Sequence, residues 1–116
     1  MTKDYSYRSG ERVTKLVHSN GEETLDSVLT KEGRTDINIC CMGQDPDVRI
    51  TAQIERNLPK KEPSGPYTQI RMKSRQSFKL KYFTFDFTET CTIDKCGSKS
   101  APQYEAEIEL ETSHLL

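Results

Sequence analysis

The sequence contains no tryptophan, only two histidines and no apolar run near the length of a membrane-spanning helix, which requires about 18 residues. Its first residues, MTKDY, lack the apolar core of a secretory signal. The sequence also lacks an excess of charge of either sign, because 17 basic and 18 acidic residues give a net charge of -1. This balance excludes a globally basic protein that coats nucleic acid. We therefore expect an intracellular protein that does not enter a membrane.

Cysteines are few and their spacing does not suggest a zinc site. Cys40 and Cys41 are adjacent, and Cys91 and Cys96 stand five positions apart. Neither pair has zinc-ligand spacing, and both histidines lie far from them in the sequence. The spacing predicts free or buried thiols. With 116 residues and 33% hydrophobic residues, the chain is expected to form one domain with a thin core.

Apolar and polar residues alternate with a period of two in most of the chain, which predicts strands rather than helices. Asn20-Gly21 predicts a hairpin turn, Asp45-Pro46-Asp47 another turn, and the proline-rich segment 58–66 a loop. We interpret residues 1–11 as a mobile arm and residues 12–116 as one all-β, antiparallel domain, either a barrel or a sandwich. The predicted strands are 12–17, 36–42, 48–54, 69–78, 81–88 and 104–111, whereas residues 24–29 are expected to form either a strand or a turn of helix.

Two of these strands carry charge of opposite sign. Residues 71–81 contain five basic residues and no acid, whereas residues 105–111 contain glutamate at every second position. Alternate carboxylates on one strand face favour oxygen-liganded Mg²⁺ or Mn²⁺. Arginine and lysine on another strand of the same sheet bind phosphate oxygens. A polar-lined barrel that presents both strands inward is suited to phosphoryl transfer to water.

Four segments occur in the order found in one known family: DVRIT at 47–51, RMKSRQSF at 71–78, FDFT at 85–88 and YEAEIEL at 104–110. With them the chain resembles, from about residue 12 to 110, the metal-dependent mRNA 5′-triphosphatases of fungi, protists and some large DNA viruses. That resemblance implies an antiparallel β-barrel of the triphosphate-tunnel type. It also implies hydrolysis of the γ-phosphate from the 5′-triphosphate end of nascent RNA, the first step of mRNA capping.

The resemblance also implies roles for individual residues. Glu107 and Glu109 correspond to ligands of a Mg²⁺ or Mn²⁺ ion, and Glu105 supports them. Lys73 and Arg75 correspond to γ-phosphate ligands, which places them with the three glutamates in the catalytic set. A loop lysine, either Lys60 or Lys61, is expected to contribute. The substrate-binding residues implied are Arg49, Lys73, Arg75, Asp86 and Thr88.

The sequence departs from this family at two places. Thr84 stands where members usually have arginine, and residues 1–46 contain no E-x-E strand to complete the metal site. We therefore expect a barrel that lacks its first strands. The implied partners are triphosphate-ended RNA or a nucleoside triphosphate, an mRNA guanylyltransferase and a second copy of the chain. The implied location is the nucleus. The alternatives are a catalytically incomplete module that docks on a guanylyltransferase, and a β-sandwich without a site.

Overall fold

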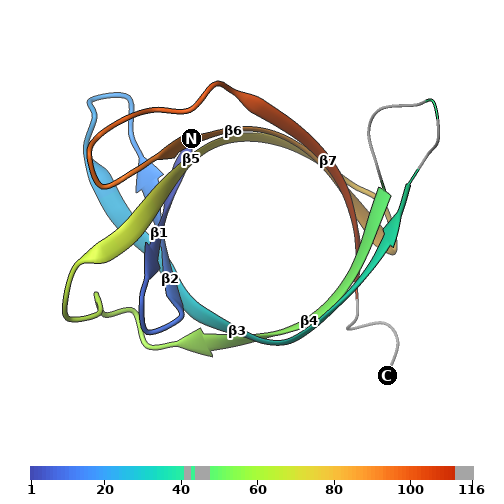
Figure 1. The fold of residues 1–116 in the computed structure, drawn as a ribbon, viewed down its shortest axis with the longest axis horizontal. Coiled ribbons are helices and arrows are strands. Elements are labelled where there is room, and N and C mark those ends of the chain that lie inside the picture. The colour runs from blue at the N-terminus through green and yellow to red at the C-terminus, as the bar shows by residue number, and fades with distance from the viewer. Residues whose placement is uncertain (41–42, 44–47, 112–116) are drawn as a thin grey trace.

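The computed structural model describes residues 1–40, 43 and 48–111, and every regular element in them is a β-strand. The strands form one antiparallel sheet in the order β4-β3-β2-β1-β5-β6-β7. This sheet curls around a central opening (Figure 1), with β4 and β7 as its two edges. The predicted all-β fold, an incomplete antiparallel barrel, is confirmed. The strands are β1 (Thr2–Tyr7), β2 (Glu11–Val17), β3 (Glu23–Ile39), β4 (Val48–Leu58), β5 (Tyr67–Lys79), β6 (Phe83–Ile93) and β7 (Gln103–Leu110).

Strand β1 lies in the middle of the sheet, between β2 and β5. Strands β1 to β4 form one consecutive meander and β5 to β7 a second, and the pairing of β1 with β5 joins them. The prediction that residues 1–11 form a mobile arm is therefore wrong for residues 2–7. These residues were misread because their alternation sets threonine, aspartate and serine against lysine and tyrosine, without aliphatic residues.

Strand β3 is longer than predicted, since Glu23–Ile39 includes the segment between residues 24–29 and the expected strand 36–42. Its register with β4 shifts between Glu32 and Thr35. Gly33 lies inside this irregularity with a φ of 61°, a conformation that glycine adopts without steric cost. The bulge therefore allows two short polar-apolar patterns to continue as one bent strand. The turn predicted at 45–47, like residues 41 and 42, lies outside the described residues.

The apolar core lies on the outer face of the curled sheet. Tyr5, Val13 and Val28 are buried there, and they are opposite one another on three adjacent strands. Residues directly opposed across antiparallel strands point to the same face, so this pairing forms one apolar row. The row continues to Leu58 on β4 and Ile70 on β5.

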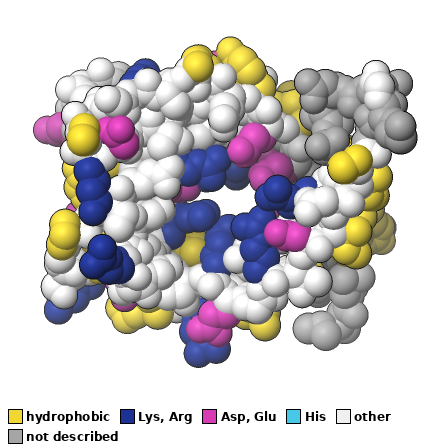
Figure 2. Space-filling view, in the orientation of Figure 1, with side chains coloured by type: hydrophobic (Ala, Val, Ile, Leu, Met, Phe, Trp, Pro, Cys, Tyr) yellow, Lys and Arg dark blue, Asp and Glu magenta, His cyan; other side chains and the backbone are white. Residues whose placement is uncertain are grey.

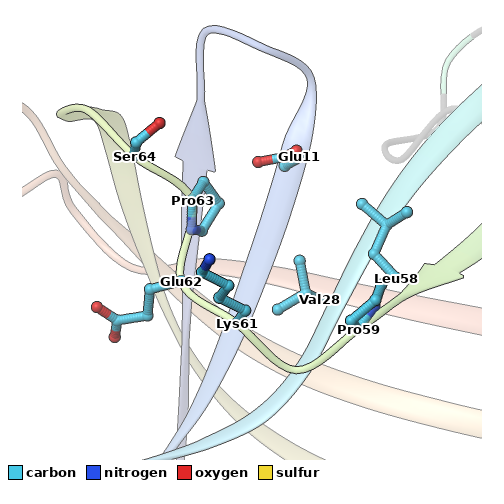
Figure 3. Close-up of a pocket in the computed structure, with 8 residues that line it drawn as sticks. All are labelled: Glu11, Val28, Leu58, Pro59, Lys61, Glu62, Pro63 and Ser64. Carbon is cyan, nitrogen blue, oxygen red and sulfur yellow. The ribbon is translucent and has the colours of Figure 1, made fainter.

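The proline-rich segment predicted to be a loop connects β4 to β5. It covers this core. Glu62 forms an ion pair with Lys15, whose ammonium lies 4.9 Å from the centre of the Tyr5 ring. Between the loop and the strands is a cavity of about 430 Å³ (Figure 3). Its lining residues are Glu11, Val28, Leu58, Pro59, Lys61, Glu62, Pro63 and Ser64.

Elsewhere the outer face carries apolar side chains without such a cover. On β3 and β4 the exposed residues include Ile37, Ile50 and Ile54, and on β7 they include Tyr104 and Ile108. Hydrophobic side chains accordingly gather around the periphery of the molecule in Figure 2. The thin core predicted from composition is therefore restricted to the centre of the sheet.

Three of the four cysteines fall within the described residues, and none of the three forms a disulfide. Cys91 is buried on β6, whereas Cys40 and Cys96 are exposed. The predicted free or buried thiols are thus confirmed for these positions. The described part of the chain also contains no helix long and apolar enough to cross a membrane.

Candidate active site

The inner face of the sheet is polar because the second set of alternating residues points towards the opening. Lysines, arginines and carboxylates surround this opening in Figure 2. The register of β5, β6 and β7 arranges them in rows across three strands, which we call the β5–β7 wall. The rows are Lys73–Thr90–Gln103, Arg75–Thr88–Glu105, Ser77–Asp86–Glu107 and Lys79–Thr84–Glu109.

The middle strand of this wall carries short side chains, and this allows contacts to span it. Arg71 on β5 reaches Glu105 on β7, with 3.1 Å between the guanidinium nitrogen and the carboxylate oxygen. Arg75 reaches Glu107 in the same way at 3.5 Å. Threonines on β6 leave room for these long arginine side chains to lie across the strand. The structure therefore brings the predicted basic and acidic strands together.

Arg75 is the most connected cation of the β5–β7 wall. Its Nε donates a hydrogen bond of 2.9 Å to the hydroxyl of Thr88, and a terminal nitrogen lies 3.5 Å from Asp86. Asp86 is buried and also accepts a hydrogen bond of 2.5 Å from Ser77. Asp86 and Thr88 thus hold the guanidinium from β6. A terminal nitrogen of Arg75 lies near the more exposed carboxylate of Glu107.

Lys73 lies deeper in the wall, and its partner is a residue that the sequence analysis did not assign to the site. Its ammonium is 2.6 Å from a carboxylate oxygen of Asp4 on β1. The other carboxylate oxygen accepts a hydrogen bond of 2.9 Å from Thr14 on β2. Burial raises the pKa of Asp4, but the hydrogen bond and charge of Lys73 outweigh it and hold that pKa below its ordinary value. The charge of Arg12 lowers the pKa of Asp4 further.

Arg12 is a second inner-face residue that sequence reasoning missed. It is opposite Ser6 on β1 and Leu29 on β3, so it points to the same face as Asp4. The alternation of residues in the predicted strand 12–17 places Arg12 on the same face as Thr14 and Leu16. It does not show which residues of other strands lie beside Arg12. A signal for Asp4 was absent, because its strand was interpreted as an arm.

The carboxylates of β7 are suited to divalent cation binding in number and type, although they are not assembled into a closed site. Glu107 and Glu109 are successive inner-face residues. Within the described residues no three carboxylate, histidine or cysteine groups converge. Mg²⁺ commonly takes one or two carboxylates and completes its octahedron with water and phosphate oxygens. Glu107 and Glu109 fit this mode of binding.

Arg49 belongs to a different part of the inner face, which we call the β3–β4 wall. Its Nε donates a hydrogen bond of 3.0 Å to Asn38. Nearby, Asp36 accepts hydrogen bonds from Arg34 and Thr51, and chiefly the Arg34 hydrogen bond lowers its pKa. The two walls occupy opposite ends of the strand order, and the hydrogen bond of Arg49 to Asn38 lies within the β3–β4 wall.

The loop lysine expected to contribute to the site has a different environment. Lys61 lines the outer cavity together with Val28 and Leu58 (Figure 3). Val28 belongs to the apolar outer row, because it is opposite Val13. The structure therefore places Lys61 on the outer face, and Lys60 is exposed in the same loop.

A curled antiparallel sheet with paired cations and carboxylates around a central opening is the architecture of an incomplete β-barrel with a polar interior. A scan against protein-family models matches residues 1–116 to the family described as mRNA capping enzyme, beta chain. The chain belongs to this family, which confirms the resemblance to RNA triphosphatases seen in the sequence. A search of curated proteins found no matching relative.

Proposed function

We propose that this chain binds the 5′-triphosphate end of nascent RNA in its central opening and hydrolyses the γ-phosphate. Family membership supports a role in mRNA capping. The observation that carries the finer proposal is the β5–β7 wall, where Lys73 and Arg75 lie on one strand and Glu105 and Glu107 on the next but one. Cations and carboxylates side by side are what a polyphosphate and its counter-ion require.

Lys73, Arg75 and Arg12 are the proposed phosphate ligands. Arg75 presents a planar fork that suits two phosphate oxygens, whereas Lys73 supplies a point charge. Asp86 and Thr88 hold Arg75 in place by the contacts described above. Arg49 on the β3–β4 wall is proposed to contact the part of the substrate nearest that wall.

Glu107 and Glu109 are the proposed ligands of a Mg²⁺ or Mn²⁺ ion. Such an ion, when bound, would neutralise charge on the phosphate oxygens. Among the described residues Glu109 forms no ion pair, and the ion pair of Glu107 is with Arg75 at 3.5 Å. Neither carboxylate therefore has to leave a tight protein contact in order to bind a cation.

In the proposed reaction a water oxygen forms a bond to the γ-phosphorus while the bond from that phosphorus to the β–γ bridging oxygen breaks. Glu105 or Glu107 orients the water through a hydrogen bond, and Lys73 and Arg75 stabilise charge on the equatorial oxygens. The products are diphosphate-ended RNA and inorganic phosphate. The residues form no covalent intermediate with the substrate.

The direct test is phosphate release from γ-labelled, triphosphate-ended RNA, and from ATP, with Mg²⁺ or Mn²⁺ and with an EDTA control. We expect metal-dependent release that is lost in Glu109→Ala, whereas Glu22→Ala, at an exposed turn residue, retains it. Circular dichroism shows whether each variant is folded. No release from the folded wild-type chain, or release that survives Glu107→Ala, Glu109→Ala, Lys73→Ala and Arg75→Ala, would overturn the proposal.

A second candidate function is docking on a capping guanylyltransferase, and the exposed apolar outer face favours it. Ile50 on β4 and Ile108 on β7 are more than half exposed, and both lie on edge strands that offer free backbone groups for strand addition. We expect Ile50→Lys or Ile108→Lys to abolish co-purification with the guanylyltransferase, whereas Glu107→Ala leaves it unchanged. Loss of co-purification in a folded Glu107→Ala variant would contradict docking through the outer face.

A further inference from the structure

Asp4 is one of the most deeply buried charged residues in the described part of the chain, with 4% of its surface exposed. Its carboxylate lies on the inner face and forms a short ion pair with Lys73 at 2.6 Å. The side chain of Lys73 is itself only 13% exposed. We call these two residues the Asp4–Lys73 pair. A buried carboxylate is retained in a fold only when it is compensated, and here the compensation comes from a proposed phosphate ligand.

The pair is built to fix a flexible side chain at one place. The register sets Lys73 opposite Thr2 on β1 and Thr90 on β6, so its ammonium reaches along β1 to Asp4. Thr14 on β2 donates to the second carboxylate oxygen from the opposite side. Thr14 on β2 and Lys73 on β5 thus hold the Asp4 carboxylate from both sides.

On the other side of Lys73 no comparable anchor exists among the described residues. Thr90 is buried, but its hydroxyl forms no hydrogen bond in this part of the chain. A lysine has three donors and a long stem with high rotamer entropy. Asp4 takes one donor and leaves the remaining donors available to a ligand. Without Asp4 the ammonium would be partly buried without a counter-charge, which favours its withdrawal from the site.

We propose that Asp4 is a positioning residue for triphosphate binding: it holds the ammonium of Lys73 in one orientation on the inner face. This inference rests on the proposed function, because it gives Lys73 a phosphate to bind. Asp4 does not contact the phosphate itself. It acts through Lys73, and its own negative charge by itself repels the ligand.

The repulsion gives the proposal a test of sign. If Asp4 were only a nearby negative charge, Asp4→Asn would strengthen binding of a polyanion. If Asp4 positions Lys73, Asp4→Asn weakens binding as much as Lys73→Ala does, about tenfold for a lost charge-assisted hydrogen bond. The double variant then binds no more weakly than Lys73→Ala alone, because the two residues act as one unit.

The experiment is isothermal titration of the full chain with inorganic tripolyphosphate, using wild type, Asp4→Asn, Lys73→Ala and the double variant. Asp26→Asn makes the same change of net charge at an exposed position and should bind like wild type. Val13→Ala weakens the outer core without touching the inner face and should also bind like wild type at a temperature where it is folded. Loss of binding in Val13→Ala as well would show that affinity follows stability, and would overturn the positioning role.

A conservative variant keeps the proposal testable if Asp4→Asn fails to fold. Asp4→Glu retains the charge and moves it by one methylene, so positioning predicts binding weaker than wild type and stronger than in Lys73→Ala. Wild-type affinity in folded Asp4→Glu, or tighter binding in Asp4→Asn, would overturn the inference. A wild-type chain that does not bind tripolyphosphate would refute the proposed function itself, whereas binding that depends on Lys73 but not on Asp4 refutes only the role of Asp4.

Discussion

The ion pair of Asp4 with Lys73 and that of Lys31 with Glu55 both lie on the inner face, yet their surroundings differ. Asp4 is buried at the centre of the sheet, whereas the side chain of Glu55, on edge strand β4, is 54% exposed. The contact distances are 2.6 Å and 3.2 Å. Solvent screens the second pair and leaves the first almost unscreened. Similar residue types on one face therefore have different energetic weight.

Position in the sheet order, and not residue type, therefore decides what each of these ion pairs contributes to stability. Exposed pairs contribute about 0–1 kcal/mol. Removal of one partner from a buried pair costs about 3–5 kcal/mol, because the other charge is left uncompensated. Stability at the centre of the sheet should therefore depend on the Asp4–Lys73 pair. The β3–β4 wall should tolerate the loss of an exposed ion pair.

The largest effect is expected for Lys73→Met, which leaves the Asp4 carboxylate buried without its cation. We expect the free energy of unfolding to fall by about 3–5 kcal/mol, measured by urea denaturation. Adding Asp4→Leu should recover most of this loss, since an apolar pair of similar volume replaces both charges. A single variant as stable as wild type would show that the pair is not buried in solution.

Low pH should also lower the free energy of unfolding of the wild-type chain, because it protonates Asp4. The pKa of Asp4 in the folded chain lies below its ordinary value of about 3.9. Its contribution is therefore complete above that ordinary value and is lost as the pH falls through the lower, folded-state pKa. We expect the stability difference between wild type and Asp4→Asn to shrink below about pH 4, as measured by urea denaturation across pH. A stability difference that instead grows as the pH falls would contradict a lowered pKa of Asp4 in the folded chain.

A smaller loss is expected for Thr14→Val, which removes the hydrogen bond to Asp4 but keeps the shape and the net charge. A hydrogen bond to a charged group contributes about 1.5–3 kcal/mol, and the lower end applies here because Lys73 remains. Thr35→Val, at an exposed position on β3, is the matched control and should change little. Equal stability of wild type and Thr14→Val would mean that Lys73 alone compensates the carboxylate.

The smallest effect is expected for Glu55→Gln on the β3–β4 wall. The exposed pair with Lys31 should contribute less than about 1 kcal/mol, and moderate salt should remove the difference from wild type. Urea denaturation at low and moderate ionic strength provides the measurement. A loss as large as that of Lys73→Met would show that ion pairs at the centre and at the edge of the sheet contribute equally.

The alternation of residue types predicted most of the fold where it included aliphatic or phenylalanine residues. Val48–Ile54 and Phe83–Phe87 show this pattern, and both lie in strands. Tyr5 is part of the buried core, but its strand has no aliphatic residue to mark a face. Likewise, local pattern could not reveal that Gly33 continues β3 through a bulge, because the partner strand supplies that register.

The candidate site was predictable only along each strand. The sequence placed Lys73 and Arg75 on one face of a strand and Glu105 and Glu107 on one face of another, and the structure places both faces on one wall. Which basic residue of β5 pairs with which glutamate of β7 depends on the register of both strands with β6. The residue pattern within a single strand does not determine that register. Asp4 was not predicted because its strand was interpreted as an arm, and because its partner Lys73 belongs to a distant segment.

The pairing of β1 with β5 has a consequence for how the chain folds. Neighbouring strands within each meander are connected by turns or loops, whereas β1 and β5 are far apart in sequence, as in the contact of Thr68 with Ser6 across 62 positions. Closing so long a loop costs entropy that local hairpins do not incur. We expect the two meanders to form first and to dock slowly. Because Asp4 and Lys73 stand on either side of that junction, their pairing would be a marker for the completion of folding.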